Sequence, residues 1–193
     1  MPLSNYLPSS RLIQPGVCTS TTRPASPYEG QAIYETDTDR TLIWDGSAWK
    51  YTWFATIPAF YAGLGSQTSY SAGSAVVFGS ATVNNGSHYN TSNGRFTAPV
   101  AGLYWFEARL LTQQDTTNCD VRFYKNGSVL SDYAGFSMVP TSAGTQHRQT
   151  HIQGVVSLAA NDYITVNAVG STINLYGAGT EKHTSFTGYW VGN

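Results

Sequence analysis

From about residue 56 to the C-terminus, short runs of alternating apolar and polar residues follow one another, separated by turn residues. Asn-Gly pairs lie at 85–86, 93–94 and 126–127, and an Asn-Asp pair lies at 161–162. Alternation with a period of two is typical of β-strands, and Asn-Gly is the strongest short signal for a hairpin turn. No segment has the periodicity of a helix of three turns. The pattern therefore predicts an all-β domain, a sandwich or a barrel of roughly eight or more strands.

The composition excludes several classes of partner. Charged residues are 11% of the chain and the formal net charge is −1, with ten Lys and Arg against eleven Asp and Glu. A nucleic-acid binder needs a basic face, which this balance does not supply. No run approaches the roughly 18 apolar residues of a membrane span. The N-terminus lacks the charged and apolar regions of a signal peptide. We therefore expect a protein that binds no nucleic acid, inserts into no membrane and is not exported by a classical signal.

Residues 1–22 contain three prolines and no sustained apolar period. Such a segment cannot bury enough surface to fold alone. We expect it to be an anchoring arm that docks on a partner or a neighbouring subunit, and the anchor candidates are Leu7, Leu12 and Ile13.

Residues 23–55 predict a small β-meander that connects the arm to the main domain, residues 56–193. Alternating runs flank the stretch 37–40, and Asp45-Gly46 marks a second turn. Three tryptophans are a large apolar content for so short a unit. Two hairpins are marginal alone, so the meander should pack on another chain or on the main domain.

The spacing of aromatic residues in the main domain is specific. Counted from Phe78, it runs through Asn84, Tyr89 and Phe96 to the stretch Gly102-Leu-Tyr-Trp-Phe. This spacing resembles the signature of the complement C1q globular-head family, which shares a jelly-roll sandwich with tumour necrosis factor. Ala108 stands where the family pattern has an aromatic residue, while residues 183–191 resemble the family's closing strand. The aromatic framework comprises Phe78, Tyr89, Phe96, Tyr104, Phe106, Phe186 and Tyr189.

The resemblance implies an obligate homotrimer in which one face of the strand near residues 102–111 turns towards the threefold axis. Alternation places Trp105, Glu107 and Arg109 on that face. Our hypothesis is that Glu107 and Arg109 pair across subunits, stacked on Trp105. The alternative is an exposed pair within one chain, worth less than about 1 kcal/mol.

Catalysis and metal binding are not expected. Glycosidase chemistry needs two facing carboxylates, whereas most acidic residues, Asp45 and Asp162 among them, fall at predicted turns. His147 and His151 follow a strand pattern, which places them roughly 13 Å apart, too far for one metal. Some heads of the C1q family bind calcium, but no ligands for it can be assigned here. We expect no enzyme and no cofactor.

The meander, with the sequence "RPASPYEGQAIYETDTDRTLIWDGSAW", resembles a short module of tail-fibre and other virion proteins of tailed bacteriophages. Together the two resemblances predict a virion surface protein that is assembled in the host cytoplasm. It would be a homotrimeric fibre or adhesin, with its arm on other virion proteins and its head displayed for a host-surface glycan or protein. Residues 112–119 and 135–148 are candidate ligand loops. The alternatives are a capsid or neck decoration fibre with a mainly structural role, and a secreted C1q-like recognition protein.

Overall fold

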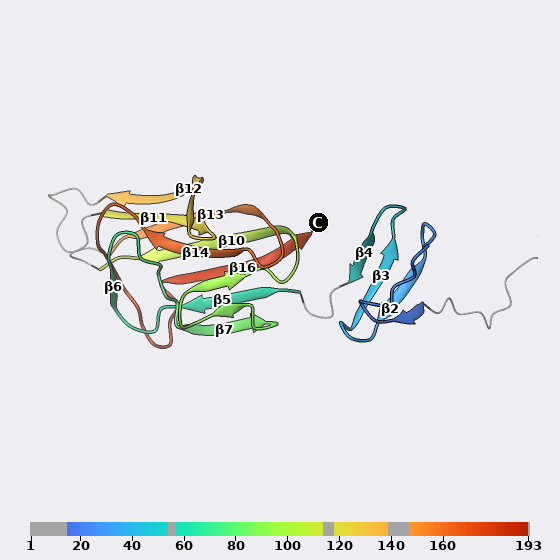
Figure 1. Cartoon of the computed structure of the whole chain (residues 1–193). Helices are drawn as coiled ribbons and strands as arrows, with labels where there is room; N and C mark the ends of the chain where they lie inside the picture. Colours follow the sequence, from blue (N-terminus) through green and yellow to red (C-terminus); the bar gives the residue numbers. More distant parts are fainter. Residues whose placement is uncertain (1–14, 54–56, 114–117, 139–146, 193) are drawn as a thin grey trace, which may run out of the picture. The chain divides into compact units, whose positions relative to one another are not determined.

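A computed structural model of the chain describes residues 15–53, 57–113, 118–138 and 147–192. The chain forms two compact units, Met1–Thr56 and Ile57–Asn193. Within the described ranges all assigned secondary-structure elements are β-strands, which agrees with the lack of helical periodicity in the sequence (Figure 1).

The first unit is a four-stranded sheet in the order β1-β2-β3-β4. β2, β3 and β4 form the predicted antiparallel meander. The second turn is closed by Asp45, whose carboxylate accepts the N–H groups of Ser47 and Ala48 at 2.9 and 2.7 Å. Gly46 in the same turn has a φ of 94°, a conformation that glycine adopts without strain. The strands are β1 Gly16–Cys18, β2 Ala32–Glu35, β3 Arg40–Trp44 and β4 Trp49–Trp53.

β1 lies inside the range predicted to be an anchoring arm. It pairs in parallel with β2, with Val17 opposite Tyr34. The segment after β1 is also fixed to the sheet, because Ser20 donates its N–H and its hydroxyl to the carboxylate of Asp37 at 2.9 and 2.6 Å. Residues 16–18 are therefore a strand of the small sheet, and Ser20 is hydrogen-bonded to it, so this part of the predicted arm is joined to the meander.

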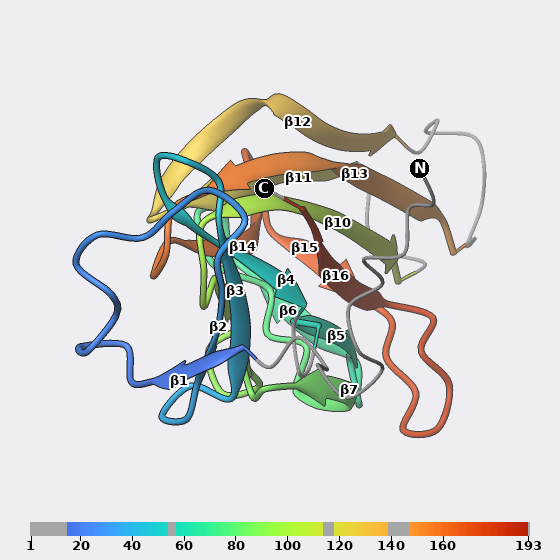
Figure 2. The same ribbon diagram turned by 90° about the vertical axis from the view of Figure 1, so that its right-hand side faces the viewer.

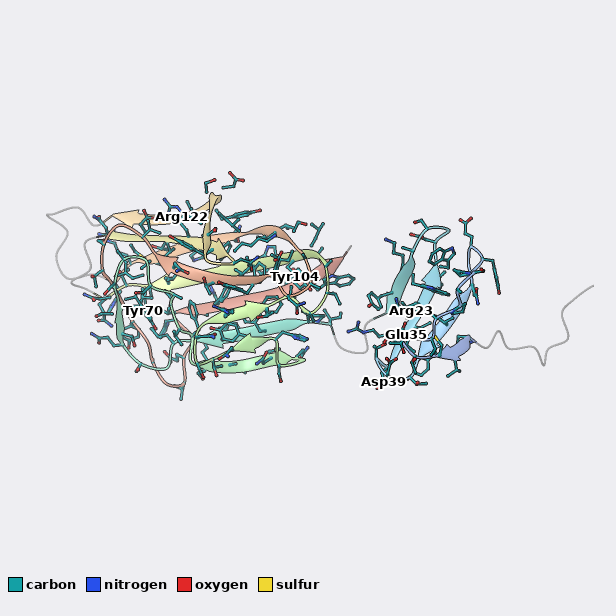
Figure 3. The ribbon with its side chains drawn as sticks, viewed as in Figure 1. Arg23, Glu35, Asp39, Tyr70, Tyr104 and Arg122 are labelled. Carbon is teal, nitrogen blue, oxygen red and sulfur yellow. The ribbon has the colours of Figure 1, made fainter. Side chains whose placement is uncertain are left out.

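The small sheet contains a buried carboxylate. Glu35 is fully buried, and it accepts hydrogen bonds from Nε of Arg23 and from the hydroxyl of Thr38 (Figure 3). Burial alone would raise the pKa of Glu35, but the hydrogen bonds from Arg23 and Thr38 outweigh it and lower the pKa. The ion pair holds the segment that contains Arg23 against one face of the sheet.

The second unit is a sandwich of two five-stranded sheets (Figure 1). The first sheet has the order β13-β10-β16-β5-β7, and the second has the order β12-β11-β14-β9-β8. A two-stranded sheet, β15-β6, completes the unit. The strands of the first sheet are β5 Ala59–Gly63, β7 Ser80–Asn85, β10 Gly102–Leu111, β13 Gln149–Leu158 and β16 Ser185–Gly192. The remaining strands are β6 Thr68–Tyr70, β8 Tyr89–Asn90, β9 Arg95–Thr97, β11 Asn118–Lys125, β12 Ser128–Met138, β14 Tyr163–Ala168 and β15 Ile173–Leu175.

β12 runs beside β13, although the two strands belong to different sheets (Figure 2). The hydroxyl of Tyr133 on β12 donates a hydrogen bond to the carbonyl of Val155 on β13. The ring of Tyr133 occupies the space that a side chain at Gly154 would need. This contact closes one side of the sandwich.

Candidate functional site

β10 has one face in the core and one face outside it. The side chains of Tyr104, Phe106, Ala108 and Leu110 are fully buried. The alternate residues of the strand are exposed or half-buried. The strand lies between β13 and β16 in its sheet, so the outward side chains of three adjacent strands form one surface.

The inner face carries most of the aromatic framework. Phe60, which the sequence analysis does not include in the framework, lies at the centre, with its ring 4.6 Å from that of Tyr89 and 5.1 Å from that of Phe96. The hydroxyl of Tyr104 donates to the carbonyl of Val100 at 2.8 Å, and burial raises the pKa of Tyr104 to about 12. Six framework residues are at most 2% exposed: Phe78, Tyr89, Phe96, Tyr104, Phe106 and Phe186.

Tyr189 differs from the rest of the framework, because it is 44% exposed on the outer face. Phe186 and Gly188 point into the sandwich, so the residue after Gly188 must point outward. The ring of Tyr189 lies 5.4 Å from that of Trp105, at an interplanar angle of 34°. The closing strand therefore contributes Phe186 and the partly buried Trp190 to the core and Tyr189 to the outer face.

The apolar end of this outer face is the candidate functional site, and we call it the outer patch. Trp105 on β10 is flanked by Val155 on β13 and Tyr189 on β16, which are its Cα partners in the two ladders. Four of its members are between 40% and 51% exposed. Contiguous exposed apolar side chains on a soluble domain typically mark a protein contact. The outer patch consists of Leu103, Trp105, Val155, Tyr189 and Val191.

The polar end of the same face carries Glu107 and Arg109. Nε of Arg109 lies 3.8 Å from Oε1 of Glu107 within one chain, and the two side chains are 42% and 23% exposed, respectively. The Cα partners of Glu107 and Arg109 on β13 are Gln153 and His151. An exposed pair of this kind contributes less than about 1 kcal/mol. The pairing of these residues across subunits stays a prediction, because the structure is that of a single chain.

His147 and His151, the two histidines considered as metal ligands, make separate contacts. His151 projects from β13 next to Arg109, whereas His147 precedes the strand and its Nδ1 lies 2.7 Å from the carbonyl oxygen of Thr112. In the part of the chain that the structure describes, no three His, Cys, Asp or Glu side chains are placed to hold a metal ion. The same part of the chain has no helix long and apolar enough to cross a membrane.

Some predicted residues lie outside the described ranges. These are the anchor candidates Leu7, Leu12 and Ile13, and residues 114–117 and 139–146 of the two candidate ligand loops.

The fold and the outer patch together define the class of protein. Solved structures with the same fold include the globular domain of zebrafish complement 1qA, at 14% identity and a TM-score of 0.55, covering 70% of this chain and 99% of that one. An Eiger TNF from S. frugiperda aligns at 6% identity and a TM-score of 0.60, over 72% of this chain and 94% of that one. These likenesses confirm the predicted all-β jelly roll of the C1q and TNF type. The C1q domain family matches residues 59–191, and the chain belongs to this family. Domains of this family form trimers and act in recognition without catalysis.

Two curated relatives are complement C1q tumor necrosis factor-related protein 3 from Mus musculus and from Homo sapiens. The mouse protein is 28% identical over 106 residues, which are 55% of this chain and 41% of the relative. The human protein is 30% identical over 80 residues, which are 42% of this chain and 32% of the relative. The chain thus spans 41% of the length of the mouse relative and 32% of that of the human relative.

These relatives correct the functional prediction. A bacteriophage virion protein, whether tail fibre, adhesin or capsid decoration, is wrong, and so is the predicted location on a virion surface, because the related proteins are mammalian C1q and TNF-related proteins. The prediction depended on residues 23–55, whereas the family match begins at residue 59. A short β-meander constrains its sequence mainly through turns and strand alternation, which unrelated proteins share. The findings favour the alternative of a C1q-like recognition protein.

Proposed function

We propose that the chain is a secreted, non-enzymatic recognition protein that works as a homotrimer assembled through the outer patch. The observation that carries the proposal is an aromatic pair on the outer face of the sheet, half-buried Trp105 and exposed Tyr189, which aliphatic side chains flank. Aromatic residues in such a setting are typical of the centre of a protein interface. The small sheet of residues 16–53 would be a separate module ahead of this head.

The arrangement of polar groups on the outer face supports one specific alignment of the three subunits. Glu107 and Arg109 lie beyond the apolar residues on the same face, where polar groups surround an apolar centre as in known interfaces. In a threefold assembly each carboxylate would approach those of the other subunits, and the neighbouring guanidinium groups would offset their repulsion. Formation of the trimer would therefore bury the apolar end and set the alignment at the polar end.

Recognition would use the three copies together. Three weak sites on one trimer bind a repetitive surface far more tightly than one site does. Parts of the predicted ligand loops, residues 118–119 and 135–138, lie in β11 and β12. The rest of the stretches 112–119 and 135–148 would carry the ligand contacts, as segments between strands commonly do. The ligand class consistent with a head of low net charge is a protein or glycan surface.

Light scattering of the purified full chain tests the assembly. The expected particle has three times the chain mass of 20.9 kDa. Trp105→Glu should give a particle of one chain mass, because it places three carboxylates in the apolar centre. Val129→Glu is the matched control, since Val129 is 51% exposed on β12, outside the outer patch. A monomeric wild type, or a trimer that survives Trp105→Glu with an unchanged circular dichroism spectrum, would contradict the proposal.

A further inference from the structure

The small sheet has almost no core of its own. Among its residues whose burial the structure describes, the fully buried side chains are Ile33, Leu42 and Glu35, and the half-buried rings of Trp44 and Trp49 lie 5.5 Å apart. Cys18 is a free thiol, and no metal cluster is present in the described ranges. Units of about 40 residues usually need a disulfide, a metal or association with another chain to be stable. The contacts within this unit therefore leave its folding energy small.

One face of the small sheet carries its buried side chains, and the side chains of the other face are half-buried or exposed. Ile33 and Leu42, which are Cα partners, lie on the buried face, together with Glu35 and its partner Arg23. The neighbouring residues on each strand point to the opposite side. There Val17 is 72% exposed and Ile43 is 39% exposed. We call this side the open face, and it comprises Val17, Ala32, Tyr34, Ile43 and Lys50.

The open face is held in shape before anything binds to it. Val17 lies opposite Tyr34, and Ala32 lies opposite Ile43, so the apolar residues occupy adjacent positions on three strands. The hydroxyl of Tyr34 donates to the carboxylate of Asp39 at 2.7 Å, which fixes the end of its side chain. A surface that needs little reordering loses little conformational entropy when it is covered.

The charge on this face favours association of identical copies. Lys50 is the one charged member of the open face, and its ammonium group lies 3.8 Å from the carboxylate of Asp45. The carboxylate of Asp39, which accepts a hydrogen bond from Tyr34, lies at the end of that side chain. Like charges brought together at a symmetric interface would cost free energy. With Lys50 at the margin on β4 and already near a carboxylate, the apolar residues can meet their equivalents without that cost.

Chain connectivity brings such copies together. β4 ends at Trp53 and β5 begins at Ala59. The connection can span at most about 20 Å when fully extended. In a trimer of the heads, three small sheets are therefore confined near one another at an effective concentration on the order of millimolar. At that concentration even a small apolar interface is populated.

We propose that the open faces of three copies pack against one another, so that the small sheet is a second self-association surface of the same trimer. The inference rests on the proposed trimer of the heads. It explains how a unit with two buried aliphatic side chains stays folded. The partner is a second copy of this chain rather than a different protein or the chain's own head.

Hydrogen exchange of the full-length trimer provides the first test. Ile43→Asp should lower the protection of the β2 and β3 amides by about tenfold or more, because the sheet loses the cover of its open face. The mass by light scattering should stay that of a trimer. Tyr28→Asp is the matched control, because Tyr28 is 69% exposed in the same unit but outside the open face, and protection should stay at the wild-type level. Unchanged protection in Ile43→Asp would overturn the inference.

Cross-linking tests whether the partner is another copy of the chain. It uses Ile43→Cys, in which the new side chain has no charge, in place of Ile43→Asp. In a Cys18→Ser background, Ile43→Cys treated with a short bismaleimide should give covalent dimers of the full chain, and Tyr28→Cys should not. Failure to cross-link Ile43→Cys, with the trimer intact, would contradict a contact between copies.

A third measurement separates this inference from the proposed function. In Trp105→Glu, the small sheet should lose protection together with the trimer, because its copies are no longer confined. If protection persists in that monomer, the open face does not depend on other copies and the inference is wrong. If the wild type itself has the mass of one chain, the proposed function fails, and it is the light scattering rather than the exchange data that shows this.

Discussion

The two units of this chain bury their side chains in opposite ways. The sandwich encloses a continuous aromatic cluster in which Phe60, Phe106 and Phe186 each contact several other rings. The small sheet encloses two aliphatic side chains and an ion pair. The first can fold on the hydrophobic effect of its own residues, whereas the second depends on specific polar contacts and on an outside surface. The comparison shows which interactions the stability of each unit depends on.

The largest effect should come from the aromatic core. Phe106→Ala removes a fully buried ring and should lower the free energy of unfolding of the sandwich by about 3–5 kcal/mol. Denaturant unfolding followed by tryptophan fluorescence measures this, with Val129→Ala as the exposed control. A loss below about 1 kcal/mol would show that the core repacks and that its rings do not set the stability.

The next effect should fall on the small sheet alone. Arg23→Ala leaves the buried carboxylate of Glu35 without its cationic partner, although the hydroxyl of Thr38 still donates to it. We expect the small sheet to lose about 1.5–3 kcal/mol, the value of a hydrogen bond to a charged group. Hydrogen exchange resolves the two units, and the amides of β10 should keep their protection. Equal losses in both units would mean that they do not unfold separately.

The stability of the two units should also respond differently to a fall in pH. The pKa of Glu35 is lowered in the folded state, so its contribution to stability is present above its ordinary pKa of 4.5 and is lost as the pH falls through the lowered value. In the sandwich, hydrogen bonds from Lys125, Asn126 and Ala159 lower the pKa of Asp162 to about 2, so its turn keeps its charge until about pH 2. Because the ordinary pKa of Glu35, 4.5, lies above that of Asp162, 3.8, the loss of protection should begin at a higher pH in β2 than in β14. Glu35→Gln should flatten the decline, and a decline of the same size in that variant would assign it to another group.

The smallest effect concerns the polar end of the outer face. Within one chain, Glu107 and Arg109 form an exposed pair, so Glu107→Gln in the monomeric Trp105→Glu background should change stability by less than about 1 kcal/mol. In the trimer, a double-mutant cycle with Arg109→Ala should show a larger coupling energy if the pair reaches across subunits. Equal coupling in monomer and trimer would assign the pair to one chain and remove its role in the register.

The sequence predicted the all-β C1q-type fold correctly, but the predicted function and location, a bacteriophage virion protein, were wrong. The alternation of residues 32–44 and 102–111 gave strands where the structure has β2, β3 and β10. The aromatic spacing from Phe78 onward led to the jelly roll that the structural neighbours confirm. The virion prediction failed because it depended on a short meander, in which turn residues and alternation leave few positions that are specific to one family.

What the sequence determined by itself is which side chains share a face of a strand, because the period of two follows from the geometry of an extended backbone. It therefore separated Tyr104 and Phe106 from Trp105. Only the tertiary structure decided which strands are neighbours. That choice brings β16 beside β10, sets Tyr189 against Trp105, and joins Arg23 to Glu35. The partners of a ladder can lie 80 residues apart, and local alternation carries no record of which distant strand completes the sheet.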